Sequence, residues 1–253
     1  FLDVPYDDDD LSVKYLAGQL RSLADNLAEL TGKPFCEEQL REIIRVENET
    51  RKELKTFFRH QKERHYPAEL VSHLYLMMGM HLLIGSREFL DLIRFMNDEI
   101  SQAPPFEGTK IMWVHLIPFY QETLKKYFNS SSDYQIVATD MSLDFAEMLD
   151  EDHPFEALAK KTIRNLFNGS YDQKSRRLAQ MASELRPDAV INFCHWGCKQ
   201  AFGGSMLLKE KMQELGIPMI NLDGDGIDKR NSHDGQIKTR LEAFLEMIKE
   251  TKC

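Results

Sequence analysis

Asp188-Ala189-Val190-Ile191-Asn192-Phe193-Cys194 is the stretch of sequence that decides the fold. Its short apolar run follows Pro187 and leads straight into a cysteine, which is typical of a buried strand. A helical pattern precedes it over Gln173 to Leu185, and another follows over Met206 to Leu215, closed by Gly216. A strand between two helices predicts one β–α unit of a parallel sheet.

The same alternation of strand and helix fills the second half of the chain. The other expected strands are Lys110–Leu116, Tyr134–Thr139 and Pro218–Leu222, and the other expected helices are Pro118–Phe128, Phe155–Phe167 and Gly235–Lys249. This pattern predicts an α/β fold with a four-stranded parallel sheet and flanking helices. Ligands of such sheets bind beyond the carboxyl ends of the strands, which are the segments Cys194 to Gly204 and Asp223 to Asp234.

The first half of the chain shows only helical patterns, from about residue 8 to residue 102. Leu70 to Ile84 is its most apolar stretch, and we expect it to form a buried helix. Gln102-Ala103-Pro104-Pro105-Phe106-Glu107-Gly108 has the composition of a linker. We therefore predict a helical region over residues 1–107 and an α/β domain over residues 108–253.

Composition excludes several classes of partner. The 253 residues carry a formal net charge of −9, which does not attract nucleic acid or anionic membranes. No apolar run approaches the roughly 20 residues that span a bilayer, and no signal peptide opens the chain. We therefore expect a cytoplasmic protein. The sequence begins without Met at Phe1-Leu2-Asp3-Val4-Pro5, and we expect it to be a piece of a longer protein.

Cys194-His195-Trp196-Gly197-Cys198 is the segment that best suits chemistry. Two thiolates separated by three residues can reach one metal centre from a turn or a first helical turn. Gly197, Gly203 and Gly204 would let the backbone approach a bulky cofactor. The alternatives are two part-buried structural cysteines, a zinc site and a redox dithiol, although no second CxxC-like pair is present for zinc. Cys36 and Cys253 are isolated, so a disulfide framework is not expected.

Two further segments carry polar groups at the same predicted edge. Asp223-Gly224-Asp225-Gly226-Ile227-Asp228 offers clustered carboxylates, but we interpret it as a solvated acidic turn rather than a cation site. Ser232 or Asp234 suits the N-cap of the last helix, with His233 between them as a surface residue. No GxxxxGK[ST] loop occurs, so we do not expect this chain to bind ATP by itself.

Three runs of sequence resemble a known family. Leu215 to Asp225, Arg230-Asn231, and Gly235 to Met247 are similar to the end of the D-component subunits of 2-hydroxyacyl-CoA dehydratases. Leu2-Asp3-Val4-Pro5-Tyr6 and the helices after it are similar to the middle of the same subunits. The chain thus resembles the 2-hydroxyacyl-CoA dehydratase and benzoyl-CoA reductase superfamily, without the N-terminal α/β domain of that superfamily.

This resemblance implies a Rossmann-like (flavodoxin-like) α/β domain and an iron–sulfur cluster between two such domains. Cys194 matches the cluster ligand that the C-terminal domain supplies, and the missing N-terminal domain would supply the remaining cysteines. Dehydratase subunits often continue with Asp-Pro after this cysteine, whereas this chain continues to Cys198. That difference resembles the double-cubane cluster proteins, in which two bridged cubanes need extra cysteines. The cluster is therefore expected to be a [4Fe-4S] cubane or a double cubane held by Cys194 and Cys198.

The resemblance also implies an activity and partners. An ATP-dependent iron–sulfur activator would deliver one low-potential electron, and the enzyme, an oxygen-sensitive lyase of anaerobic metabolism, would eliminate water from a 2-hydroxyacyl-CoA. The subunit would work as a homodimer or with a paralogous subunit. The alternatives are a double-cubane or benzoyl-CoA-type reductase and a non-catalytic, cluster-free partner subunit.

Overall fold

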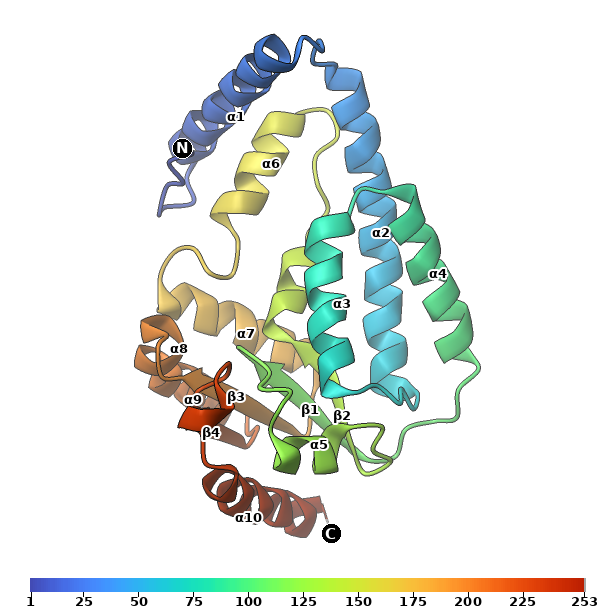
Figure 1. Ribbon diagram of the computed structural model, residues 1–253, viewed down its shortest axis with the longest axis vertical. Coiled ribbons are helices and arrows are strands. Elements are labelled where there is room, and N and C mark those ends of the chain that lie inside the picture. The colour runs from blue at the N-terminus through green and yellow to red at the C-terminus, as the bar shows by residue number, and fades with distance from the viewer. Residues whose placement is uncertain (253) are drawn as a thin grey trace.

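The computed structural model describes residues 1–252, so Cys253 lies outside the described residues. Four helices come first and an alternation of strands and helices follows, with the chain running from blue to red in Figure 1. The helices of the first part are α1 (Asp10–Thr31), α2 (Glu37–Glu63), α3 (Leu70–Leu83) and α4 (Arg87–Ser101). The elements of the second part are β1 (Thr109–Val114), α5 (Glu122–Phe128), β2 (Tyr134–Thr139), η1 (Asp140–Phe145), α6 (Pro154–Ile163), α7 (Tyr171–Leu185), β3 (Ala189–His195), α8 (Lys199–Gly203), α9 (Ser205–Glu214), β4 (Met219–Gly224), η2 (Lys229–Asn231) and α10 (Asp234–Lys252).

The strands form one parallel sheet in the order β2-β1-β3-β4, which confirms the predicted α/β fold with flanking helices. β1 and β3 are the central strands because each has a partner on both sides. In the pairing of β3 with β4, Cys194 lies opposite Asp223. The carboxyl ends of all four strands therefore meet at one edge of the sheet.

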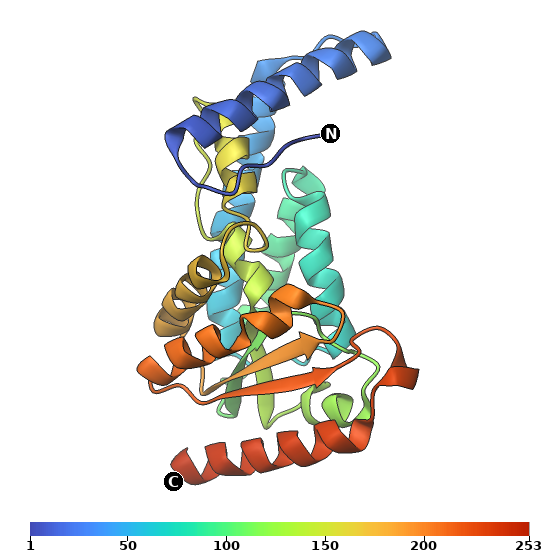
Figure 2. The ribbon, with the colours of Figure 1, turned by 90° about the vertical axis from the view of Figure 1, so that its left-hand side faces the viewer.

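Helices cover both faces of the sheet, as Figure 2 shows. On one face, Trp113 of β1 and Phe193 of β3 pack in a core with Leu241 of α10. On the other face, Met112 of β1 packs in a second core with Leu178 of α7 and Met212 of α9. Neighbouring residues of a strand point to opposite faces, and burial on both faces explains why the strands read as continuous apolar runs.

The helical part is joined to the second part of the chain by packing as well as by sequence. Leu16 of α1 packs in one cluster with Phe155 and Ile163 of α6, and these two helices lie side by side at the top of Figure 1. Leu54 of α2 packs in another cluster with Phe145 of η1. The helices before the sheet are thus held by segments that follow β2.

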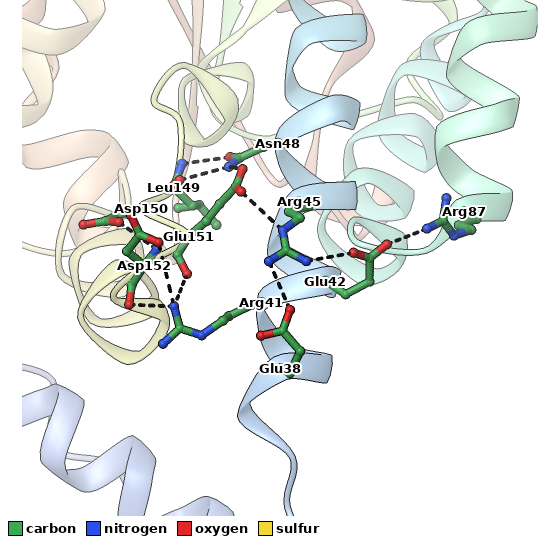
Figure 3. A network of polar contacts seen from close by, with 10 residues as sticks. All are labelled: Glu38, Arg41, Glu42, Arg45, Asn48, Arg87, Leu149, Asp150, Glu151 and Asp152. Atoms are coloured by element: carbon green, nitrogen blue, oxygen red, sulfur yellow. Dashed lines mark hydrogen bonds and ion pairs between the residues drawn. The ribbon is translucent and has the colours of Figure 1, made fainter.

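The loop before α6 is fastened to α2 by polar contacts, which Figure 3 shows from close by. The Asn48 side chain donates to the carbonyl of Leu149 and accepts from its N–H, at 2.9 Å each. Arg41 donates to the carbonyls of Glu151 and Asp152 at 3.0 and 2.8 Å. Backbone groups that a loop leaves unpaired are satisfied here by helical side chains, which fixes the start of α6.

Two helix boundaries differ from the expectation by four residues. α5 begins at Glu122 rather than Pro118, because residues 118–121 form a turn in which Gln121 N–H donates to the Pro118 carbonyl at 3.0 Å. α6 ends at Ile163 rather than Phe167. Asp234 is the first residue of α10, and its carboxylate accepts from the N–H of Thr123 at 3.0 Å, so it caps α5 across space.

Leu70 to Ile84 is expected to form a buried helix, and the prediction of burial is wrong. The helix forms as α3, and Leu70 and Met80 are buried, but Leu82 is 78% exposed and Tyr75 and Met78 are exposed as well. A run that is apolar all round gives no sign of which face meets the rest of the protein. Within residues 1–252, no helix combines the length and apolar character that crossing a membrane requires.

Candidate functional site

Cys194 lies at the carboxyl end of β3, in the position that the sequence predicts. Its thiol is buried, with the residue only 2% exposed, and the Sγ donates to the carbonyl of Ala201 at 3.6 Å. The Asn192 amide donates to the same Sγ at 3.3 Å. Burial raises the pKa of Cys194 to about 11, and the charge of Asp223 makes a smaller contribution in the same direction. The thiol is therefore neutral unless a cation compensates the charge of the thiolate.

Cys198 is the residue immediately before α8. Its N–H donates to the His195 carbonyl at 3.0 Å, which closes the turn between the two cysteines. Its Sγ accepts from the N–H of Ala201 at 3.4 Å. Ala201 therefore contacts the sulfur of Cys194 through its carbonyl and the sulfur of Cys198 through its N–H. The fold thus places both predicted site residues in contact with Ala201 of α8. Cys36, in contrast, is exposed at the start of α2.

The acidic segment after β4 forms a turn that uses its own carboxylates. Asp225 accepts from the N–H groups of Ile227 and Asp228 at 2.9 Å, and these bonds together with Asn231 lower the pKa of Asp225 to about 2. Asp228 pairs with Arg230 at 2.5 Å. These contacts support the interpretation as a turn, which places Gly226 so that its N–H donates to Nδ1 of His195 at 3.0 Å.

A buried polar cluster that the sequence reasoning missed lies behind Cys194. It consists of His115 after β1, Asp140 after β2, Lys174 on α7 and Asn192 in β3, all of them buried. His115 Nδ1 lies 2.8 Å from the Asn192 Oδ1, and His115 Nε2 lies 2.8 Å from the Lys174 Nζ. Lys174 Nζ also lies 3.6 Å from the Asp140 carboxylate. His115 and Asp140 follow the carboxyl ends of β1 and β2, whereas Asn192 lies in the middle of β3.

Tyr171, the first residue of α7, brings another polar group to the same region. Its hydroxyl is buried and has no hydrogen-bond partner among residues 1–252. Burial raises the pKa of Tyr171 above its usual range, and the charges of Cys194 and Asp140 raise it further. A buried hydroxyl without a partner is uncommon, and it offers a hydrogen bond to a group bound near the cysteines.

The cysteine donor set fits part of a metal centre. Cys194 and Cys198 supply two soft sulfur donors, and within the described part of the chain no three His, Cys, Asp or Glu side chains gather to hold a metal ion. Iron–sulfur cubanes take three or four thiolates, so further ligands would have to come from outside residues 1–252. The residues fit a cluster shared with another segment and do not by themselves form a closed zinc site.

A separate cleft of about 680 Å³ lies between α2, η1 and α7. Lys55, Arg59 and Lys62 of α2 and Arg177 of α7 contribute to its lining, and neither cysteine does. The cleft is therefore distinct from the site around Cys194.

A signal for the missed residues was present in the sequence. His115 and Asp140 directly follow apolar strands, and Asn192 interrupts the apolar run of β3. A polar residue at the carboxyl end of a parallel strand marks the ligand-binding edge, so His115 and Asp140 were as strongly indicated as Cys194. Lys174 gave no such signal, since a lysine on a helix is ordinarily solvated.

Comparison with known proteins identifies a family and several distant relatives of this chain. Residues 1–248 match the family model of the 2-hydroxyglutaryl-CoA dehydratase D-component. The chain is 23% identical over 246 residues to the (R)-phenyllactyl-CoA dehydratase beta subunit of Clostridium sporogenes, covering 93% of this chain and 64% of that protein. It is 22% identical over 263 residues to subunit alpha of the (R)-2-hydroxyglutaryl-CoA dehydratase of Acidaminococcus fermentans, covering 98% of this chain and 54% of that protein.

The alpha subunit of the Clostridium sporogenes enzyme is similar as well, at 20% identity over 265 residues, 98% of this chain and 63% of the subunit. The chain thus spans less than two thirds of the length of these relatives. The family match, in contrast, extends over nearly all of the chain. The chain therefore belongs to the 2-hydroxyglutaryl-CoA dehydratase D-component family.

Proposed function

We propose that this chain is the helical and C-terminal part of an iron–sulfur subunit of a 2-hydroxyacyl-CoA dehydratase-type enzyme. The enzyme is a lyase that removes water from a 2-hydroxyacyl-CoA. The observation that carries the proposal is the buried sulfur of Cys194 at the carboxyl end of a central parallel strand, in a chain of this family.

Cys194 is the proposed ligand from this chain, and cysteines of an N-terminal domain complete the set. Burial raises the pKa of Cys194 to about 11, so on binding iron the thiol would lose its proton to form a thiolate whose charge the metal offsets. When bound, the cluster supplies one low-potential electron and an iron that acts as a Lewis acid toward an oxygen of the acyl-CoA. The Asn192 amide keeps the sulfur oriented toward α8.

The partners follow from the same proposal. The similar proteins include alpha and beta subunits of dehydratases, which supports assembly with a paralogous subunit or a second copy. The proposed electron donor is an ATP-hydrolysing iron–sulfur activator, which the resemblance to the dehydratases implies. Activator and enzyme act together in an anaerobic cytoplasm.

Cys198 favours a second candidate, a double-cubane reductase of small molecules. Its sulfur contacts the same residue, Ala201, as the sulfur of Cys194 does. A second thiol in this position suits two bridged cubanes, because a double cubane needs more cysteine ligands than a single cubane does.

Iron and acid-labile sulfide per chain, measured anaerobically on the full-length protein, test the proposal. About four irons per chain would support a single cubane and the dehydratase-type role. About eight would favour the double cubane with Cys198 as a ligand. Iron-free and colourless full-length protein would reject both and leave a non-catalytic partner subunit.

A further inference from the structure

Hydrogen bonds connect Lys174 to Cys194 through His115 and Asn192, and the donor and acceptor atoms of these residues determine the direction of each bond. The Asn192 Oδ1 lies 2.8 Å from Nδ1 of His115, and an amide oxygen only accepts, so His115 carries its proton on Nδ1. Its Nε2 then holds a lone pair, which accepts from the Lys174 Nζ at 2.8 Å. His115 is therefore neutral. It accepts a hydrogen bond from Lys174 and donates one to Asn192.

The amide of Asn192 ends this chain of hydrogen bonds at the sulfur. Its Nδ2 has two hydrogens, and the two partners are Asn221 Oδ1 at 2.9 Å and Cys194 Sγ at 3.3 Å. Asn192 and Cys194 are two residues apart in β3 and therefore face the same side of the sheet. The hydrogen bonds from Lys174 to His115, from His115 to Asn192 and from Asn192 to Cys194 thus run in one direction.

A buried ion pair forms the far end of this chain of hydrogen bonds. The side chains of Lys174 and Asp140 are each 1% exposed, and the Nζ and the carboxylate lie 3.6 Å apart. Water does not screen a charge in this position, and hydrogen bonds in series polarise one another. His115 itself has a φ of 67°, a left-handed conformation that ends the extended backbone of β1 at the histidine.

We propose that Lys174, His115 and Asn192 are positioning residues that donate a polarised hydrogen bond to the sulfur of Cys194. The chain stabilises electron density on that sulfur and holds it toward α8. Its consequence for a cluster rests on the proposed function, because hydrogen bonds to ligating sulfurs make a cluster easier to reduce. The hydrogen-bond chain itself does not depend on a cluster.

Two spectroscopic measurements on the present chain test the hydrogen bonds directly. The ¹⁵N resonances of His115, assigned by loss in His115→Asn, are expected to show a neutral ring protonated at Nδ1. The Raman S–H band of Cys194, assigned by loss in Cys194→Ser, is expected to shift in Asn192→Leu. The matched control Asn97→Leu removes another buried amide, which donates to Glu53 in the helical part, and should leave the band in place.

His115→Asn separates a polarised chain from a local packing effect. Asparagine suits the left-handed backbone and keeps an amide donor toward Asn192, but it does not reach Lys174. His115 has no hydrogen bond to Cys194, so a smaller shift of the S–H band in the same direction would support transmission through Asn192. A protonated Nε2 in His115, or a band that is unchanged in both variants, would overturn the proposal.

The full-length protein separates this inference from the proposed function. If it holds a cluster, Asn192→Leu with wild-type iron content is expected to lower the midpoint potential. A tenfold change in the reduction equilibrium is about 59 mV for one electron. An unchanged potential at full iron content would overturn the effect on the cluster. If the wild-type protein holds no iron, the proposed function fails, and the two spectroscopic tests still decide the hydrogen-bond chain.

Discussion

Gly204 lies so close to the ring of Tyr171 that a Cβ at this position would be 2.1 Å from the ring Cγ. Gly204 separates α8 from α9, and Tyr171 begins α7. The ring therefore covers the backbone between these two helices, and α8 connects this point to the loop that carries both cysteines. This contact holds the cysteine loop against α7, the helix that also supplies Lys174.

Gly204→Ala is expected to destabilise the protein by about 1–3 kcal/mol, because the added methyl forces the ring or the helix to move. The Tyr171 Cγ, Cδ1 and Cδ2 atoms would all lie within 2.3 Å of the new Cβ. Gly203→Ala is the matched control, since a Cβ at Gly203 meets no atom within 4 Å. Urea unfolding measures both, and equal stability of the two variants would contradict this packing.

Cys194→Ser in the full-length protein is expected to abolish most of the bound iron, because the serine oxygen is a poorer ligand for iron than a thiolate. Cys198→Ser is expected to lower iron content only if the protein holds a double cubane. Cys36→Ser, at the exposed start of α2, serves as the control and should retain all iron. Wild-type iron content in Cys194→Ser would reject the ligand assignment.

Arg51 and Glu47 form a buried ion pair on α2, with 2.5 Å between the Nη2 and Oε1 atoms and side chains 1% and 5% exposed. Arg51→Met is expected to cost about 3–5 kcal/mol, because it leaves a buried carboxylate with less compensation. The expected value lies toward the lower end, since Lys161 still pairs with Glu47 at 2.8 Å.

Arg94→Met is the matched control for the buried pair. Arg94 is half-exposed and pairs with Glu49 at 3.0 Å, so its loss should cost no more than about 1 kcal/mol. Denaturant unfolding of the two variants decides the point. Similar costs for Arg51→Met and Arg94→Met would show that the buried pair is not an important contribution to stability.

The α/β fold could be predicted because its evidence is local. The apolar runs of β1, β2 and β3 lack polar alternation, which is the pattern of strands buried on both faces. The position of Cys194 followed from the end of one such run. The exposure of α3 could not be predicted, because a helix that is apolar on every side carries no pattern that distinguishes its faces.

The polar cluster could not be assembled from the sequence because it depends on strand order. His115 contacts Asn192 only because β1 and β3 are neighbours, and no periodicity encodes that order. Lys174 joins the cluster through the face of α7 that meets the sheet. Its partner Asp140 is 34 positions away along the chain and follows β2. Local patterns therefore indicated each strand end but not which ends meet.

His73 on α3 is 6% exposed, and burial lowers the pKa of its imidazole from 6.5 to about 4. Between these values the unfolded chain binds a proton that the folded chain does not, so stability is highest above pH 6.5 and falls as the pH drops toward 4. At about 1.4 kcal/mol per pH unit, the loss attributable to His73 is roughly 3 kcal/mol. His73→Gln should remove this dependence, measured as the difference in unfolding free energy from the wild type at several pH values.

His153 provides a control of opposite sign. It is exposed, and the hydrogen bond that its ring donates to the Asp150 carboxylate raises the pKa of its imidazole. Its contribution to stability is therefore present below pH 6.5 and is lost as the pH rises through its folded-state pKa. At low pH, His153→Gln should be less stable than the wild type. His73→Gln should be more stable at low pH, relative to its stability difference from the wild type at pH 7. A difference between His73→Gln and the wild type that stays constant from pH 7 to pH 4 would show that the histidine is not held neutral by burial.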